Sequence, residues 1–514
     1  MTKSHNPPAT IPLCELIGAR GQIAEVPDIQ VSGLAIDSRA VQPGELFFAL
    51  SGSRENGLQF VDQALKKGAV AVLYDPVGAD RTTIERLQAV TDCPLIAVPS
   101  LSIERGPIAD RFYGQPSKDL DVIGVTGTNG KTSCCHFLAR ALSKFKPTGV
   151  IGTIGWGYPD RLQELVNTTP EPIQLQHALA TFRDEGAKCV VMEVSSHGLA
   201  QQRTRAIRFR GAAYTNITRD HLDYHKTMQV YVNAKLKLLS YPGLEFVIVN
   251  MDDRYADQIL AAVPPDVRIL GFSRSLKPYS PFTRLMMSAL RHDDQGVEFK
   301  VHFEGRTVPV SAPLFCDFNV DNLLTVLGVM LEMGITLPQA VDALQMIKPV
   351  TGRLERFSSG PVAPTVIVDY AHTPHALQSV LEGLKLHCRG KVWLIFGCGG
   401  DRDRGKRPLM GRIAEMNADH VILTDDNPRH EDGSVIIKEI LKGMSNPDMS
   451  VDRDRRRAIA SVIQKAAPQD IVLIAGKGHE QTQEIDGIKV PFSDQRVARE
   501  ELAKRAKAVE GAPQ

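Results

Sequence analysis

Hydrophobic residues along this chain gather in short runs that alternate with segments of helical spacing. Residues 121–125 form an apolar run that predicts a strand, and residues 136–142 carry the apolar spacing of a helix. The apolar runs at 189–194, 212–216 and 246–250 predict further strands between helices. Because strands that alternate with helices are typical of parallel sheets, the pattern predicts an α/β fold.

Turn-forming residues divide this pattern into three blocks. Residues 113–118 predict a linker after the first block, and a helix at 319–333 ends the second. Further strands are predicted at 33–36, 46–49, 69–74, 95–98, 365–369, 391–396, 420–424 and 470–475. A chain of 514 residues is too long for a single hydrophobic core. We predict three domains: a smaller N-terminal α/β domain (1–117), a central domain with a mostly parallel sheet (118–349), and a doubly wound, Rossmann-like C-terminal domain (350–514).

The composition is that of an ordinary globular protein. A formal net charge of +1 argues against nucleic acid as the main partner. The eight cysteines lack metal-binding spacing and suggest no disulfides, so a reducing cytoplasm is the expected location. The N-terminal run MTKSHNPPATIPL is not expected to be a signal peptide, and the most apolar helix, at 323–335, is too short to span a bilayer. We therefore expect a soluble protein with no membrane insertion.

The run from Ile123 to Thr132 carries the clearest chemical signal. An apolar strand turns through the glycine-rich loop 127–130 into Lys131 and Thr132. Such a loop turns its backbone N–H groups toward phosphates, while the lysine adds positive charge and the threonine hydroxyl can bind Mg²⁺. The spacing departs from the common pattern, since Val125 stands where a glycine is expected. We predict a nucleoside triphosphate site; the alternative is a glycine-rich turn with a chance Lys-Thr pair.

Three further features of the second block are candidates for the same site. Glu193 ends a predicted strand, where a carboxylate can hold Mg²⁺, although an N-cap cluster for the next helix is the alternative. Segment 216–225 is dense in ligand types, with His221 the best metal-ligand candidate; a solvated loop is the alternative. Lys235 lies on a predicted helix at 231–239, and from the residues alone it would be a surface lysine.

Polar segments elsewhere suit the rest of a nucleotide and an amino acid. Segments 319–322, 351–355 and 369–374 offer amides, an arginine and a carboxylate, with cap and turn chemistry as the alternative for each. The loops at 399–407, 424–429 and 476–480 all follow predicted strands, so they should converge on one crevice. Their arginines suit a carboxylate and their acidic groups an ammonium, as a zwitterionic amino acid requires.

With these motifs in place, the chain resembles the Mur ligase family. The resemblance rests on segments 34–39, 44–48, 123–132, 167–170, 193–198, 218–225, 369–372, 426–429 and 476–480. It implies a UDP-binding, an ATPase and an amino-acid-binding domain. It further implies an ATP-dependent amide-forming ligase of peptidoglycan synthesis, which adds meso-2,6-diaminopimelate to UDP-N-acetylmuramoyl-L-alanyl-D-glutamate through an acyl phosphate. The rivals are a lysine-adding or folylpolyglutamate-type ligase and a non-enzymatic, nucleotide-gated binding protein on the same fold.

The resemblance also implies roles for individual residues, with small molecules as the substrates and a monomer as the state of the protein. Catalytic roles are implied for Lys131, Glu193, His221 and Lys235. ATP would bind to Gly127, Thr128, Asn129, Gly130, Lys131, Thr132, Ser133, Asn322, Arg353 and Asp369. The UDP-muramyl dipeptide would bind to Ile36, Ser38, Asn167, Thr168, Thr169, Ser195, Gln201 and Arg203. Diaminopimelate would bind to Arg402, Asp426, Asn427, Pro428, Arg429, Gly476 and Glu480.

The metal ligands come from the same resemblance. Two Mg²⁺ ions are implied, with Thr132, Glu193, His221 and Lys235 as the ligands. Lys235 aligns with a lysine that is carbamylated in this family, and a carbamate turns that cation into an anionic ligand. Asp321 departs from the tyrosine expected there, which weakens only the detail of the base contact.

Overall fold

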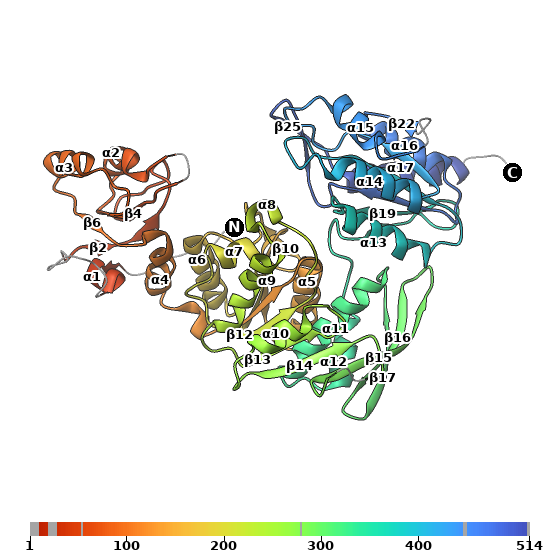
Figure 1. Cartoon of the computed structure of the whole chain (residues 1–514), viewed down its shortest axis with the longest axis horizontal. Coiled ribbons are helices and arrows are strands. Elements are labelled where there is room, and N and C mark those ends of the chain that lie inside the picture. The colour runs from red at the N-terminus through yellow and green to blue at the C-terminus, as the bar shows by residue number, and fades with distance from the viewer. Residues whose placement is uncertain (1–9, 19–27, 53–54, 278–279, 446–449, 511–514) are drawn as a thin grey trace. The chain divides into compact units, whose positions relative to one another are not determined.

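The computed structural model describes residues 10–18, 28–52, 55–277, 280–445 and 450–510 (Figure 1). The chain divides into two compact units. The first comprises Met1–Lys131, Leu142–Ile248 and Asp257–Ile269, and the second comprises Thr132–Ala141, Val249–Ala256 and Leu270–Gln514. The fold is α/β, as the hydrophobic pattern predicts. The domain boundaries at residues 117 and 349 remain predictions. Residues 1–9 belong to the N-terminal run that is not expected to be a signal peptide, and they lie outside the described residues.

The first block is a four-stranded parallel sheet covered on both faces. Its strands pair in the order β3 (Gly33–Ala35), β4 (Glu45–Ala49), β5 (Ala71–Tyr74), β6 (Leu95–Ala97). Neighbouring side chains of a strand point to opposite faces. Phe48 packs with α1 (Leu13–Ile17) and α4 (Leu101–Phe112), and Phe47 packs with α2 (Val61–Lys66) and α3 (Arg81–Val90). Smaller elements are η2 (Gly57–Phe60) and the antiparallel pair β1 (Ile11–Pro12) and β2 (Gln30–Val31).

The predicted linker is anchored to the block that follows it. It ends in the 3-10 helix η3 (Pro116–Lys118). The carbonyl of Tyr113 accepts a hydrogen bond from Arg183 Nη1 at 3.0 Å, and Ser117 Oγ accepts one from the backbone N–H of Arg208 at 3.1 Å. Ile173, on the next block's helix α6 (Pro172–Asp184), joins the core under α4. These contacts tie the first block to the phosphate-loop block within the first unit.

The phosphate loop follows a central strand of a parallel sheet. In order of hydrogen-bonded neighbours these strands are β10 (Arg161–Gln163), β9 (Gly155–Tyr158), β8 (Thr148–Gly152), β11 (Cys189–Glu193), β7 (Asp121–Thr126), β12 (Phe209–Tyr214) and β13 (Phe246–Asn250). The pairs β8–β11, β11–β7 and β7–β12 are parallel, whereas β9 and β10 add an antiparallel edge. Glu193 pairs with Val125, so the carboxylate and the loop leave the sheet at the same end. The helices of this region are α5 (Lys131–Leu142), α6, α7 (Ser196–Ala200), α8 (Leu222–His225), α9 (Met228–Leu236), followed by η4 (Lys237–Ser240), and α10 (Ala256–Ala262).

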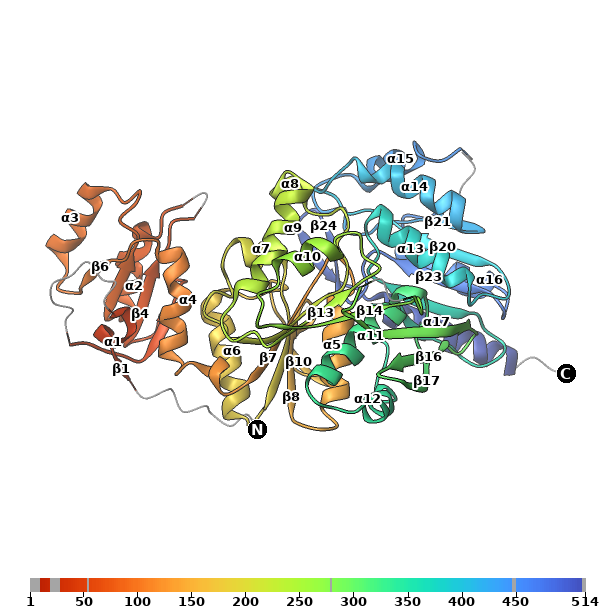
Figure 2. The same ribbon diagram turned by 60° about the horizontal axis from the view of Figure 1, so that its bottom comes forward.

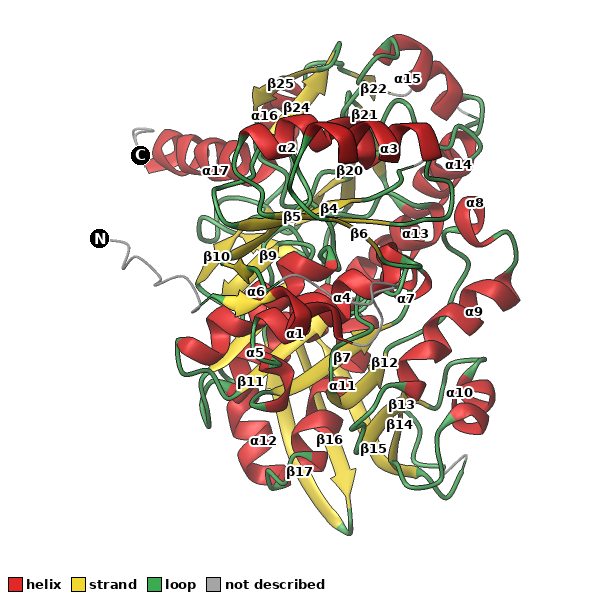
Figure 3. Ribbon diagram, turned by 90° about the vertical axis from the view of Figure 1, so that its left-hand side faces the viewer, coloured by secondary structure: helices red, strands yellow, loops and turns green. Residues whose placement is uncertain are grey.

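A run of four consecutive strands at residues 268–312 was not predicted. They are β14 (Arg268–Ser273), which starts at the end of the first unit, and β15 (Thr283–His292), β16 (Val297–Phe303) and β17 (Arg306–Ala312). The last three are antiparallel and form long strands (Figure 3). Buried and exposed positions alternate along β16, the pattern of a sheet with one wet face. Helices α11 (Asp317–Glu332) and α12 (Leu337–Leu344) follow.

The third block is the doubly wound sheet that the sequence predicts. Its strand order is β18 (Glu355–Phe357), β19 (Thr365–Asp369), β23 (Ile471–Ala475), β20 (Val392–Phe396), β21 (His420–Leu423), β22 (Ser450–Val451). Only the pair β18–β19 among these neighbours is antiparallel in the described structure. One core packs under α13 (Pro374–Lys385), α14 (Lys406–Asn417) and α15 (Gly433–Leu441). The other packs under α16 (Arg455–Lys465) and α17 (Asp494–Glu510) (Figure 2). A hairpin of β24 (Thr482–Ile485) and β25 (Ile488–Pro491) is added.

Across the described residues, no helix combines the length and the apolar character that a membrane crossing needs. All eight cysteines lie in the described part of the chain, and all are free thiols.

Candidate active site

The phosphate loop takes a shape that only glycine permits at two positions. Gly127 has φ +147° and Gly130 has φ +85°, both in the region that side chains rarely adopt. A Cβ on Gly127 would lie 1.9 Å from Thr215 Oγ1. That hydroxyl donates to the carbonyl of Asn129 at 2.7 Å. Thr215, the residue that follows strand β12, therefore lies against the loop and limits Gly127 to glycine.

The segment after β12 supports the loop from behind. Asn216 accepts at Oδ1 from the N–H of Asn129 at 3.0 Å, and its carbonyl accepts from the N–H of Thr128 at 2.7 Å. The N–H of Thr218 donates to Thr128 Oγ1 at 2.9 Å. Sequence reasoning noted this segment only as a source of metal ligands and missed its structural role. The available signal was its position, since it follows the strand next to the loop strand.

Lys131 begins helix α5 and turns its ammonium toward the loop. Its Nζ donates to the carbonyls of Gly127 and Thr128 at 3.0 and 2.8 Å. Thr132, the next residue, is buried, and Ser133 is partly exposed. A helix N-terminus carries a partial positive charge and unsatisfied N–H groups. The loop, the ammonium and the helix end thus form a cradle suited to phosphate oxygens.

Lys235 is not a surface residue, so the prediction from the residues alone is wrong. It is 1% exposed, and its Nζ donates to the carbonyl of Gly127 at 2.6 Å. Burial, and then the ammonium of Lys131, hold the pKa of Lys235 well below its usual value, against the opposing effect of Asp220. One turn earlier on α9, the Tyr231 hydroxyl lies 2.9 Å from that of Thr128. Helix α9 therefore holds the phosphate loop at two points.

Glu193 is a buried carboxylate held by a residue that sequence reasoning missed. It is 1% exposed. Thr153 donates its backbone N–H to Oε1 at 2.7 Å and its hydroxyl to Oε2 at 3.2 Å. A Cβ on Gly152 would lie 2.2 Å from Oε1, so the glycine leaves room for the carboxylate. The Thr153 hydroxyl also lies 3.0 Å from that of Thr168.

Most residues predicted to bind the UDP-muramyl dipeptide join Glu193 in one network. The Thr169 hydroxyl donates to the Glu193 carbonyl at 3.0 Å and lies 3.0 Å from Ser195 Oγ. Arg203 donates to the Thr169 carbonyl at 2.8 Å and to Gln201 Oε1 at 2.6 and 2.9 Å. The N-cap alternative holds for Ser195, whose Oγ caps α7 by accepting from the N–H of Gly198. Because Ser195 Oγ already accepts one hydrogen bond, a substrate could bind there only through the lone pair or the O–H group that the cap leaves free.

The other residues of that group lie apart in the described contacts. Asn167 is exposed beside Val166, which is 93% exposed. Ser38 is buried in the first block and donates to Gln63 Oε1 at 2.7 Å, whereas Ile36 is 43% exposed. The structure therefore brings five of the eight residues together and leaves these three outside the network.

His221 lies at the rim of this network in a left-handed backbone conformation. Its φ is +52°, and its Nε2 is 3.4 Å from Asp220 Oδ2. Its ring centroid lies 4.7 Å from that of His197, whose pKa is lowered to about 4, chiefly by burial. About half of the His221 side chain is exposed, so the solvated-loop alternative describes this residue's surroundings.

Within the described part of the chain, no three His, Cys, Asp or Glu side chains are arranged to hold a metal ion. Mg²⁺ is commonly held by one or two protein ligands, with water and phosphate oxygens completing its shell. Glu193 keeps lone pairs for such an ion, since each of its oxygens accepts one bond from Thr153. The donor set therefore fits Mg²⁺ that is shared with a triphosphate.

The residues predicted for the nucleoside end have partners within the protein. Asp369 accepts the N–H groups of Leu354 and Ala371 at 2.8 and 2.7 Å, so the turn alternative accounts for its carboxylate. Arg353 stacks over the Tyr370 ring at 4.5 Å, and its Nε is buried without a hydrogen-bond partner. Asn322 is buried; its Nδ2 donates to Asn319 and its Oδ1 is 3.3 Å from Cys134 Sγ. Arg353 thus keeps the clearest capacity for a ligand.

The three polar loops of the third block converge, as predicted. The N–H of Gly400 donates to the carbonyl of Asn427 at 2.9 Å, and Arg429 Nη1 donates to the carbonyl of Gly400 at 2.7 Å. A Cβ on Gly399 would lie 2.9 Å from Arg429 Nη1 and 3.7 Å from Arg402 Cγ. The Arg429 guanidinium and the Arg402 stem therefore both pack against Gly399, and an arginine there suits a carboxylate ligand.

Arg429 itself has a left-handed backbone. Its φ is +54°. The backbone N–H donates to the carbonyl of Glu484 at 3.0 Å, and its carbonyl accepts from Asp486 at 2.7 Å. The hairpin β24–β25 therefore fixes the turn that follows Pro428 and aims the guanidinium back at Gly400.

The acidic groups of the same loops are largely buried. Burial raises the pKa of Asp426, which Arg455 and Lys477 oppose. A Cβ on Gly476 would lie 2.4 Å from Asp426 Oδ2, so this glycine makes room for that carboxylate. Asn427 Nδ2 donates to Glu480 Oε2 at 2.7 Å. All seven residues predicted for diaminopimelate belong to these loops.

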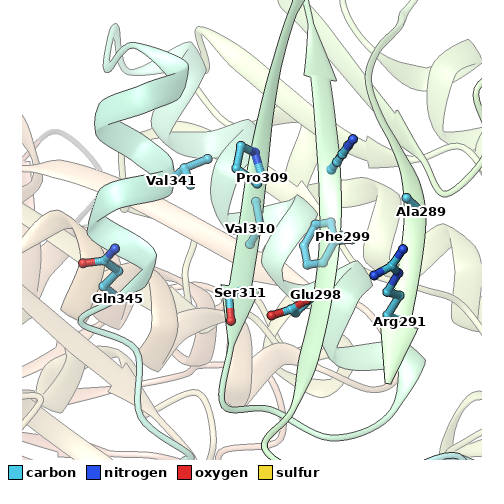
Figure 4. Close-up of a pocket in the computed structure, with 10 residues that line it drawn as sticks. Ala289, Arg291, Glu298, Phe299, Pro309, Val310, Ser311, Val341 and Gln345 are labelled. Atoms are coloured by element: carbon cyan, nitrogen blue, oxygen red, sulfur yellow. The ribbon is translucent and has the colours of Figure 1, made fainter. Parts of the chain in front are cut away.

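A cavity of about 560 Å³ lies elsewhere, on strands β15–β17 beside α12 (Figure 4). Its polar lining includes Arg291, Glu298, Ser311 and Gln345. None of the residues predicted to bind substrate lines it. Mixed charges on an open sheet face are ordinary solvated surface, so we assign this cavity no part in the chemistry.

Comparison with known proteins connects these features. Three domain families match: the Mur ligase family catalytic domain at residues 30–97, the Mur ligase middle domain at 125–330 and the Mur ligase glutamate ligase domain at 352–478. A protein of Alkalilimnicola ehrlichii named UDP-N-acetylmuramoyl-L-alanyl-D-glutamate--2,6-diaminopimelate ligase is 46% identical over 479 residues, which are 92% of this chain and 95% of that protein. The chain belongs to the Mur ligase family.

Other Mur ligases agree with this assignment. A Pseudomonas aeruginosa protein of the same name is 44% identical over 481 residues, or 93% of this chain and 96% of that protein. A solved structure with this name aligns at a TM-score of 0.69 and 34% identity, covering 96% of this chain and 99% of that chain. MurF of Acinetobacter baumannii aligns at a TM-score of 0.67 and 19% identity, covering 97% of this chain and 100% of that one, which shows the shared fold alone. As a Mur ligase the chain is an enzyme, so the non-enzymatic alternative is wrong.

Proposed function

We propose that this Mur ligase joins meso-2,6-diaminopimelate to the γ-carboxylate of D-glutamate in UDP-N-acetylmuramoyl-L-alanyl-D-glutamate, while ATP becomes ADP and phosphate. The observation that carries the amino-acid assignment is that the loops of Arg402 and Arg429 are hydrogen-bonded to each other through Gly400. Glu480 lies on a loop that is hydrogen-bonded to theirs through Asn427. Two arginines and a carboxylate on joined loops match a substrate with carboxylate and ammonium groups at both ends. The names of relatives at 44 and 46% identity support the same choice.

The reaction needs two steps because a carboxylate is a poor electrophile. In the first, a glutamate oxygen bonds to the γ-phosphorus of ATP, the bond to the β,γ-bridging oxygen breaks, and ADP leaves. In the second, the neutral amine bonds to the acyl carbon, the carbon–oxygen bond to phosphate breaks, and one proton is released. Lys131 and the N-terminus of α5 would stabilise the negative charge that develops on the transferring oxygens.

Mg²⁺ would be held by Thr132 and Glu193, with a second ion near His221 and modified Lys235. When bound, it would neutralise charge on the phosphate oxygens. Two residues of this chain are placed to support this role. Thr153 donates to both carboxylate oxygens of Glu193 and holds that side chain in place. Lys131 places a positive charge beside Gly127.

We further propose that Lys235 is carbamylated. A neutral amine bonds to the carbon of CO₂ and releases one proton, so the reaction needs a lysine whose pKa is lowered. Burial and Lys131 lower the pKa of Lys235. Its contact with Gly127 places the modified group beside the phosphate loop. Eight free thiols support a reducing cytoplasm as the location, and a monomer is the state we expect.

Release of ADP tests this proposal. The protein is mixed with ATP, Mg²⁺ and UDP-muramyl dipeptide, and single amino acids are added in turn. We expect release that depends on both the dipeptide and meso-diaminopimelate. Equal rates with L-lysine would refute the amino-acid assignment, whereas release that needs no muramyl dipeptide would refute the acceptor.

A further inference from the structure

Lys477 is a buried lysine between the glycines of the loop 476–480, and the proposed reaction leaves it without a role. Its side chain is 0% exposed, although a lone ammonium is costly to bury. The ammonium donates to Asn427 Oδ1 at 2.8 Å, to Glu480 Oε2 at 2.9 Å and to the carbonyl of Thr482 at 2.8 Å. An ammonium has three N–H groups, so these bonds use all of them. Lys477 can therefore act on a ligand only through the groups that it holds.

The first of these groups is the amide of Asn427. Its Oδ1 accepts from Lys477 and also from the backbone N–H of Glu484 at 3.0 Å. The other side of the amide, Nδ2, donates to Glu480 at 2.7 Å. A flipped amide would turn its N–H groups toward an ammonium that has only donors. Lys477 therefore decides which side of Asn427 faces Glu480.

The second group is the carboxylate of Glu480. Both Lys477 and Asn427 donate to its Oε2, and the contacts described for this side chain include none to Oε1. About a third of the Glu480 side chain remains exposed. Although burial alone would raise the pKa of Glu480, the ammonium of Lys477 and the Asn427 amide lower it, so the group stays ionised. Oε2 is thus committed to the protein, and Oε1 keeps its lone pairs for a ligand.

We propose that Lys477 is a positioning residue, which holds Glu480 Oε2 and the Asn427 amide so that Glu480 Oε1 meets an ammonium group of the amino-acid substrate. This inference rests on the proposed function. The substrate ammonium would donate to Oε1, while its carboxylates go to Arg402 and Arg429. Lys477 would then fix the orientation in which the substrate binds, because Glu480 is already positioned for the ammonium group in the free enzyme.

A double-mutant cycle tests this coupling. KM for meso-diaminopimelate and KM for ATP are measured for the wild type, Lys477→Met, Glu480→Gln and the double variant. Loss of a charge-assisted bond is expected to raise KM for diaminopimelate by about tenfold to a hundredfold in each single variant. The double variant should match Glu480→Gln alone, because the lysine works through the carboxylate. KM for ATP should stay within about twofold.

Lys504 on α17 offers a matched control. It forms a Lys–Glu pair with the same three-residue separation, with Glu501 at 2.6 Å, but it lies outside the three loops and its side chain is 65% exposed. Lys504→Met should leave both KM values unchanged. If Lys477→Met unfolds, Lys477→Arg takes its place in the cycle, because a guanidinium cannot make the same three bonds from one nitrogen.

Two results separate the two proposals. Single effects that multiply in the double variant, or a KM for diaminopimelate that Lys477→Met leaves within about twofold, would overturn the role of Lys477. A wild-type enzyme that uses another amino acid in place of diaminopimelate would overturn the proposed function. The cycle would then be measured on that amino acid, whose ammonium meets the same carboxylate.

Discussion

Replacing Thr153 by valine tests the link between Glu193 and catalysis most directly. Valine keeps the shape of threonine and the backbone N–H that donates to Glu193 Oε1 at 2.7 Å. It removes the hydroxyl, which donates to Oε2 at 3.2 Å and lies 3.0 Å from the Thr168 hydroxyl. The carboxylate therefore stays in place but loses one of its two described bonds, and Thr168 loses a partner.

The size of the effect follows from these distances. A hydrogen bond to a charged group contributes about 1.5–3 kcal/mol, and 3.2 Å is long for an O–H donor, so the lower figure applies. Each 1.36 kcal/mol corresponds to about a tenfold change. We therefore expect kcat/KM for ADP release to fall about tenfold, with the folded state retained. If Glu193 holds Mg²⁺, the concentration of Mg²⁺ at half-maximal rate should rise as well.

The assay is ADP release over a titration of the UDP-muramyl dipeptide, which gives kcat/KM, and over a separate Mg²⁺ titration, with thermal unfolding measured in parallel. Thr181→Val is the control, since that hydroxyl donates only to the carbonyl of His177 within α6, at 2.9 Å. A Thr153→Val variant with kcat/KM within twofold of the wild type and an unchanged Mg²⁺ dependence would refute the reasoning. Equal losses in both variants would assign the effect to stability alone.

Four other outcomes are expected. Lys131→Ala should lower ADP release by at least about a hundredfold without unfolding the protein, because it removes charge from a loop and no core volume; a loss of less than about tenfold would contradict the phosphate-loop assignment. Lys235→Ala should be nearly inactive, and the wild-type rate should depend on dissolved bicarbonate. A Lys235→Ala variant that keeps most of its activity would exclude Lys235 from the site. Arg429→Ala should raise KM for diaminopimelate and narrow its preference over lysine; unchanged selectivity would exclude Arg429 from the site. Burial lowers the pKa of His136 from 6.5 to about 4, so the unfolded chain binds more protons than the folded protein between these pH values. The free energy of unfolding should therefore fall by about 2 kcal/mol between about pH 7.5 and about pH 5. Urea unfolding of His136→Gln should show a smaller loss over the same pH range.

The sequence predicts the parts of the fold whose pattern is local. Buried parallel strands such as β11 and β23 are continuous apolar runs, and a loop that must follow its strand can be placed from it. The strands β15–β17 were not predicted, because their alternating pattern carries no motif and their pairing joins distant residues. The start of α5 at Lys131, ahead of the apolar spacing, reflects a helix that begins at the end of the phosphate loop.

The candidate site divides in the same way. Lys131 and the three loops of the third block could be predicted because their residue types, at the ends of predicted strands, are typical of phosphate and amino-acid binding. Thr153, Thr215 and Lys477 could not, since each holds a residue that lies far away in sequence, which for Lys477 is Asn427. The burial of Lys235 was also hidden, because the helix pattern of α9 does not show that Gly127 lies against it.

The left-handed backbone at Arg429 has a consequence for protein engineering. A non-glycine residue at φ +54° carries a conformational cost that glycine or asparagine would reduce. Selection for thermal tolerance alone, or a design procedure that rewards backbone fit, would therefore favour replacing this arginine. At this position, thermal stability and specificity for the amino acid favour different residues. A stabilised version of this enzyme should therefore keep Arg429 and gain stability at other positions.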